Sequence, residues 1–131
     1  MTIYAQDLAC KCGECEREMG FTDDAVSALN DLEQDFGRPL QINSGWRCRQ
    51  HPEERDKRWP GPHTTPDDDN VCVDVGIYGR DAYKLIGLAI SHGFRGIGLK
   101  QVGEYPSRFV HLDKVLASSV RRPRPWCWTY R

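Results

Sequence analysis

The amino-acid sequence predicts an α+β fold in which a small antiparallel sheet is flanked by helices and long loops. Two segments space their apolar residues as amphipathic helices do, and four short segments are rich in strand-forming residues. Their order is a helix, a strand, a long loop, a strand, a helix and then further strands, which is typical of an α+β domain. At 131 residues the chain is long enough for one domain, spanning residues 1–131.

The first helix is expected to begin at Thr22 or Asp23, because either residue can cap its N-terminus. Gly37 ends this helix, and Pro39 prevents it from resuming. Its apolar residues fall at helical spacing and predict one buried stripe: Val26, Leu29, Leu32 and Phe36. The second helix is expected from about residue 80 to residue 92, with Gly93 as its end. Its predicted apolar face carries Tyr83, Ile86, Ala89 and Ile90.

Strands are expected at residues 40–43, 71–78, 96–99 and 109–113. Residues 47–70 are polar and rich in proline, so they predict a long irregular loop, and loops of this length in compact domains are usually functional or disordered. A Cys-rich loop is expected at about residues 8–20. The tail, about residues 121–131, is rich in Pro and Trp, and we expect it to be non-helical and to place its aromatic rings over the domain.

Composition excludes several classes of protein. The net charge of −1 gives no basic field for nucleic acid or for an anionic membrane surface. No apolar run approaches the roughly 20 residues of a membrane span. The first residues carry neither a basic start nor an apolar core, so we expect no secretory signal and synthesis in the cytoplasm. Action outside the cell would then need another route of release.

Three of the six cysteines, Cys10, Cys12 and Cys15, lie close together in the sequence. Thiolate metal ligands are often spaced in this way, but no second Cys-x-x-Cys pair follows. A structural zinc site would therefore need a fourth ligand from Cys48 or from a histidine. We favour reduced, partly buried thiols in a tight loop, with the structural zinc site as the alternative.

Two of the predicted strands carry polar residues at positions where a buried strand usually has apolar ones. Asp74 interrupts an apolar strand, and a buried carboxylate is costly unless it pairs, caps backbone amides or binds a metal. His111 alternates with Phe109 and Asp113, so these three share one face of their strand. Together with His63 from the long loop, two imidazoles and one carboxylate form a standard catalytic zinc set that leaves one position open for water.

Several segments resemble a known family in their order and spacing. They are residues 44–48 (Ser-Gly-Trp-Arg-Cys), 61–65 (Gly-Pro-His-Thr-Thr), 73–75, 93–98 and 108–113. The chain resembles the LAS-type zinc murein metallopeptidases, the group of D-Ala-D-Ala carboxypeptidases and L-alanyl-D-glutamate endopeptidases. The closest likeness is to small single-domain phage and bacterial members. Residues 10–13 and 123–126 match the start and the tail of those members, so the resemblance covers nearly the whole chain.

This resemblance implies a zinc cleft with His63, Asp74 and His111 as the metal ligands. It also places Arg47, and Ser44 of the same motif, at the substrate, where the planar guanidinium suits a carboxylate or a carbonyl. The implied reaction is hydrolysis of an amide bond in peptidoglycan stem peptides or cross-links, by a carboxypeptidase or an endopeptidase. The implied partner is peptidoglycan peptide, in the context of a phage virion, a holin or cell lysis.

The sequence departs from the family pattern in two places. The segment from His63 to Asp74 is four residues longer than the family's His-x-x-Gly-x-Ala-x-Asp, and Cys72 stands at the alanine position. The acid that many members carry three residues before the last histidine is replaced here by Arg108. Asp113 is therefore our candidate for the general base, because it shares a strand face with His111, and Glu104 is the reserve.

Two other functions remain open. The altered ligand spacing and the missing acid are compatible with a catalytically weak or inactive peptidase-like module. Such a module would have a binding or structural role, for example as a component of a phage virion. The cysteine cluster and the basic tail are compatible with a zinc module that binds nucleic acid, but the net charge argues against it.

Overall fold

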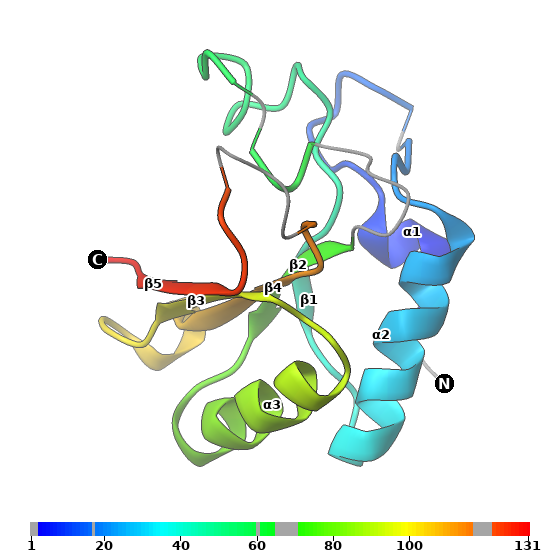
Figure 1. The fold of residues 1–131 in the computed structure, drawn as a ribbon. Coiled ribbons are helices and arrows are strands. Elements are labelled where there is room, and N and C mark those ends of the chain that lie inside the picture. The colour runs from blue at the N-terminus through cyan, green and yellow to red at the C-terminus, as the bar shows by residue number, and fades with distance from the viewer. Residues whose placement is uncertain (1–2, 17, 60, 65–70, 117–121) are drawn as a thin grey trace.

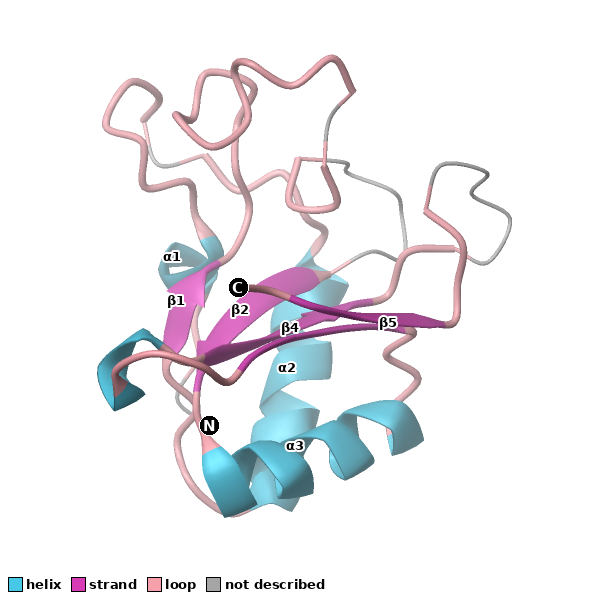
Figure 2. Cartoon of the chain, turned by 90° about the vertical axis from the view of Figure 1, so that its left-hand side faces the viewer, coloured by secondary structure: helices cyan, strands magenta, loops and turns pink. Residues whose placement is uncertain are grey.

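A computed structural model describes residues 3–16, 18–59, 61–64, 71–116 and 122–131. One mixed sheet lies between two long helices on one side and long loops on the other (Figure 1), and the view turned by 90° shows the same division (Figure 2). The elements are α1 Ala5–Leu8, α2 Asp23–Phe36, β1 Ile42–Ser44, β2 Cys72–Gly76, α3 Gly79–Ser91, β3 Gly96–Lys100, η1 Tyr105–Ser107, β4 Phe109–Asp113 and β5 Trp126–Thr129.

The strands lie in the order β1-β2-β4-β3-β5. The first four pair antiparallel, as predicted, whereas β5 runs parallel to β3. The α+β class is therefore confirmed, and the sheet becomes mixed because the tail, for which no strand was predicted, adds an edge strand. Its backbone is held by hydrogen bonds from Trp126 N to Arg95 O (3.0 Å) and from Tyr130 N to Leu99 O (2.8 Å).

Helix α2 confirms the first predicted helix. Gly37 follows it with a left-handed φ of 89°, a conformation in which glycine is favoured. The predicted stripe is buried at Leu29, Leu32 and Phe36, whereas Val26 is only partly buried. The end of the helix is tied to the next segment because the Glu33 carboxylate accepts a hydrogen bond from Leu40 N (2.9 Å).

The predicted apolar face of α3 is only partly correct, because Ala89 is buried and Ile86 is partly buried against the core. Tyr83 is 83% exposed and Ile90 is 59% exposed. The buried residues of the helix are Ala82, Leu85 and Ala89, so the first two lie one position before the predicted Tyr83 and Ile86. Both sets have helical spacing, but the small alanines let the helix backbone approach the sheet while Leu85 fills the core between them.

The remaining strands lie close to their predicted positions. β4 matches its predicted residues, and β3 ends one residue later than expected. β2 begins one residue later and ends two residues earlier than expected, and β1 begins two residues later. Within residues 47–59 and 61–64 the chain forms only turns and bends, as predicted for the long loop. The extra residues between His63 and Asp74 lie largely outside the described residues. No helix in the described part combines the length and the apolarity that crossing a membrane requires.

Strands β2 and β4 have two different faces. Their side chains toward α2 and α3 are fully buried apolar residues, namely Val73, Val75, Val110 and Leu112. Because neighbouring residues of a strand point to opposite faces, the side chains between them point toward the long loops. The centre of the sheet therefore presents a polar cluster beneath these loops.

Candidate metal centre

Strand pairing brings Asp74 and His111 together. They are directly opposite each other in the antiparallel pair β2–β4, so both point to the loop side of the sheet. Asp74 Oδ1 lies 3.1 Å from His111 Nδ1, and the two residues are 8% and 1% exposed. The sequence placed both residues on strands, and the fold makes them neighbours.

His63 reaches the same point from the long loop. Its Nδ1 donates a hydrogen bond to the carbonyl of Gly45 (2.6 Å), because a carbonyl oxygen can only accept. Nε2 is then the unprotonated nitrogen of the neutral ring, and it lies 3.4 Å from Asp74 Oδ1. Gly45 is required here because a Cβ atom would lie 2.6 Å from the Leu8 backbone, which passes directly beside it.

Asp74 lies at a ligand-like distance from each of the two imidazoles. Bonds of about 2.0–2.1 Å in a tetrahedral arrangement place neighbouring ligand atoms about 3.3 Å apart. Asp74 Oδ1 is 3.1 Å from one imidazole nitrogen and 3.4 Å from the other. One carboxylate and two imidazoles are donors that zinc commonly takes in catalytic sites, so the donor types of His63, Asp74 and His111 and the approach of Asp74 to each imidazole are compatible with a zinc ion.

Cys72 is a further donor that the sequence analysis did not include. It is fully buried, and its Sγ lies 3.6 Å from His111 Nε2. One donor atom each from His63, Cys72 and His111 lie within 4.8 Å of one another, so these three residues could also hold a metal ion. The two-residue period of a strand places Cys72 on the same face as Asp74, and this was the signal that could have found it.

The ionisation of the cluster favours positive charge at its centre. Burial opposes protonation of His63, but Cys72 and Asp74 outweigh this effect and raise the pKa of His63 to about 9. Burial likewise opposes protonation of His111, yet Cys72 and Asp113 raise its pKa well above the ordinary value. Burial would raise the pKa of Asp74, but hydrogen bonds from both imidazoles hold it well below its usual range. A metal cation can replace the protons that this site attracts.

Asp113 is fully buried, and all of its hydrogen-bonding positions are used. Oδ1 accepts from Val115 N (3.1 Å) and Arg124 Nε (2.9 Å). Oδ2 accepts from Arg124 Nη2 (2.7 Å) and lies 2.8 Å from His111 Nε2. Burial would raise the pKa of Asp113, but His111 and Arg124 hold it well below its usual range. Gly96, opposite in β3, is required because its Cβ would lie 2.3 Å from Asp113 Oδ1.

Arg47 borders the candidate metal ligands. Its Nη2 donates to Asp74 Oδ2 (3.3 Å), and its Nε donates to Ser44 Oγ (3.1 Å). The side chain is 16% exposed, so it is not completely enclosed. Glu104, by contrast, is exposed between β3 and β4, and among the described residues it forms no ion pair with either imidazole.

A family model described as peptidase M15 matches residues 2–113. The chain belongs to the M15 peptidase family. The family resemblance expected from the sequence is thereby confirmed. The search of curated proteins and the search of solved structures returned no match. In this M15 peptidase the family match includes all the donors of the metal centre and ends at Asp113, so Arg124 and β5 lie beyond it.

Glu54 organises the loop that carries His63 in this M15 peptidase, and the sequence analysis missed it inside a polar segment. It is 1% exposed, and its Oε1 accepts from Gly61 N (3.1 Å) and Thr64 Oγ1 (3.0 Å). Its Oε2 accepts from Lys57 Nζ (2.8 Å) and Arg47 Nη1 (3.4 Å). These four bonds tie both sides of His63 and the guanidinium of Arg47 to one buried carboxylate.

Replacing Glu54 by glutamine is expected to lower the free energy of unfolding by about 1–3 kcal/mol, because two charge-assisted bonds are lost while the volume is kept. Urea denaturation measures this change. Glu53→Gln, which alters an exposed neighbour, is the matched control and should leave stability nearly unchanged. Equal stability of the two variants would contradict the organising role of Glu54.

Proposed function

We propose that this M15 peptidase hydrolyses an amide bond in peptidoglycan stem peptides or cross-links, using one zinc ion held by His63, Asp74 and His111. The observation that carries this proposal is the approach of two imidazole nitrogens to Asp74 Oδ1 at 3.1 and 3.4 Å. A zinc ion bound by such a set supplies a water of lowered pKa, about 7, and polarises the substrate carbonyl.

Arg47 and Ser44 are proposed to bind the substrate. The guanidinium lies beside Asp74, and its Nε is fixed by the Ser44 hydroxyl. A fixed, planar guanidinium offers paired donors to a carboxylate or a carbonyl of the stem peptide. It would orient the peptide with its scissile carbonyl over the metal ligands, which lowers the entropic cost of reaching the reactive geometry.

The proton acceptor proposed from the sequence was Asp113, with Glu104 in reserve. A carboxylate that already accepts four hydrogen bonds has no lone pair left for a water proton. These bonds favour a positioning role, in which Asp113 holds His111 Nε2 so that Nδ1 faces Asp74. Glu104, exposed in the connection between β3 and β4, remains the second candidate for the proton acceptor.

The proposed activity is tested by digesting purified peptidoglycan and identifying the fragments by mass spectrometry. We expect new amine and carboxylate ends from one type of amide bond, loss of these products with a metal chelator, and recovery when zinc is added back. The masses also show which bond is cut, and so separate carboxypeptidase from endopeptidase activity. Cleavage that a chelator does not affect would overturn the mechanism.

A second candidate function is a metal-binding module without turnover, for example a component of a phage virion. The position of Cys72 favours it, because a thiolate beside both imidazoles would fill the fourth coordination position and leave none for water. Stoichiometric zinc without any product from peptidoglycan or its fragments would support this function over hydrolysis.

A further inference from the structure

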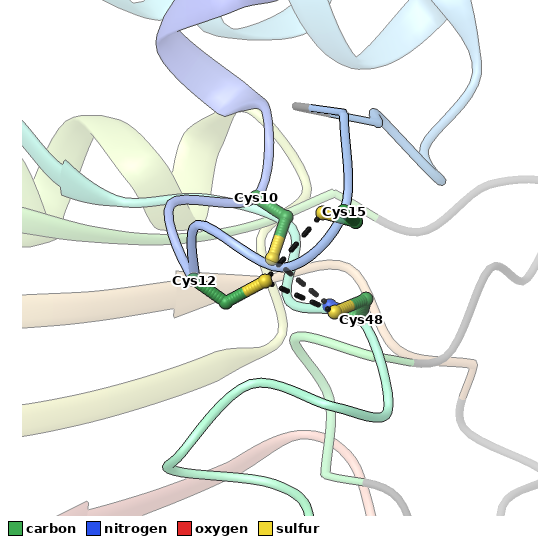
Figure 3. Close-up of side chains that lie close together, drawn as sticks. All are labelled: Cys10, Cys12, Cys15 and Cys48. Carbon is green, nitrogen blue, oxygen red and sulfur yellow. Dashed lines mark hydrogen bonds between the residues drawn. The ribbon is translucent and has the colours of Figure 1, made fainter.

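A second group of possible metal donors consists of four cysteines outside the histidine centre. Cys10, Cys12 and Cys15 follow α1 in one loop, and Cys48 comes from the loop after β1. Figure 3 shows the four side chains turned toward one another, with their sulfur atoms at the centre of the cluster. One sulfur atom from each residue lies within 4.8 Å of every other.

The sulfur separations match a shared metal ion rather than disulfide bonds. Cys12 Sγ lies 3.6 Å from Cys15 Sγ and 3.5 Å from Cys48 Sγ. A disulfide requires about 2.05 Å between sulfur atoms. Four thiolates around zinc, each with a bond of about 2.3 Å, place their sulfur atoms about 3.8 Å apart in a tetrahedron. Two of the separations are therefore close to those of a four-thiolate zinc site, and all of them lie within 4.8 Å.

The backbone supplies donors to the same sulfur atoms. Cys48 N donates to Cys10 Sγ (3.3 Å), and Glu14 N donates to Cys12 Sγ (3.3 Å). Hydrogen bonds of this kind favour a negatively charged sulfur and fix its direction, as the outer contacts of metal ligands do. Cys10 and Cys48 are buried, whereas Cys12 and Cys15 are half-buried, so the site is enclosed on one side and open to an entering ion on the other.

We propose that Cys10, Cys12, Cys15 and Cys48 bind a second zinc ion as four thiolates. Binding releases one proton from each thiol and forms four zinc–sulfur bonds, which leaves a complex of charge −2. Four protein ligands leave no position for water, so the site is structural. The zinc ion would connect the N-terminal loop to Cys48, the residue that follows Arg47. This proposal rests on the positions of the sulfur atoms and does not depend on the proposed function.

The test measures metal in the full chain. Purified under reducing conditions with zinc and then desalted, the wild type should show zinc–sulfur bonds of about 2.3 Å by X-ray absorption, in the amount expected if one of its two zinc ions has four sulfur ligands. Loading with cobalt should give thiolate-to-cobalt charge-transfer absorption. Because Cys72 could add one thiolate at the other centre, the cobalt spectrum is also measured in Cys72→Ala, where the absorption should persist.

Variants assign the signal to these residues. Cys12→Ser and Cys48→Ser should each lose one equivalent of zinc and the four-sulfur signature, while retaining the zinc bound by the histidine centre. Cys127→Ser, which removes an exposed cysteine outside the cluster, should change neither quantity. Two results on the wild type together would overturn the proposal, even if a variant failed to fold. They are the absence of a sulfur-rich zinc environment and the reaction of all thiols with a thiol reagent in the presence of zinc.

Discussion

Replacing Asp74 by asparagine is expected to remove zinc from the histidine centre and to lower kcat/KM on peptidoglycan by more than about 100-fold. Asparagine keeps the size of the side chain but removes the negative charge that lies between both imidazoles. Loss of even an outer hydrogen-bond partner of a metal ligand costs about 10–100-fold in affinity or activity, so loss of a ligand should cost more. Zinc content after desalting and the rate of fragment release measure the two effects.

Cys72→Ala is the matched control for this prediction, because Cys72 lies on the same strand face two residues away. With Asp74 as the third ligand, Cys72→Ala should retain zinc and hydrolysis. The reverse pattern, zinc lost in Cys72→Ala and kept in Asp74→Asn, would assign the centre to His63, Cys72 and His111. Faster hydrolysis in Cys72→Ala would show that the thiol competes with water for the fourth position.

Local patterns were sufficient for most of the secondary structure and for part of the site. Helix α2 has a clear end at Gly37, and β4 has a clean two-residue alternation, so both were predicted at or near their observed bounds. The same alternation placed Asp113 beside His111. The contact between Asp74 and His111 needed more than alternation, because it depends on which strands pair and in which register.

Features that depend on distant contacts were not predicted. Part of the face of α3 was wrong because two apolar stripes that share Ala89 are otherwise offset by one residue, and only the sheet decides between them. Strand β5 was missed because Pro123 and Pro125 directly precede it and made the tail look irregular, although Trp and Thr favour strands, and its pairing with β3 depends on the fold. The fourth cysteine of the sulfur cluster could not be chosen from the sequence, because the fold and not the spacing brings Cys48 to Cys12.

Replacing Arg124 by methionine is expected to lower the free energy of unfolding by about 3–5 kcal/mol and the melting temperature by roughly 10–20 °C. Arg124 holds Asp113 with both Nε and Nη2, and the two side chains are only 4% and 0% exposed. Methionine retains much of the aliphatic volume, so the loss comes mainly from a buried carboxylate left without its strongest partner.

A double-mutant cycle separates this charge effect from general damage to the tail. If the cost of Arg124→Met comes from the unpaired carboxylate, Asp113→Asn should recover part of it in the double variant, because the buried charge is then gone. Arg131→Met, at an exposed arginine of the same tail, is the control and should change stability little. Additive losses in the cycle would instead mean that Arg124 stabilises the tail through its packing on Trp128, whose ring centroid lies 5.1 Å from the guanidinium carbon, and not through Asp113.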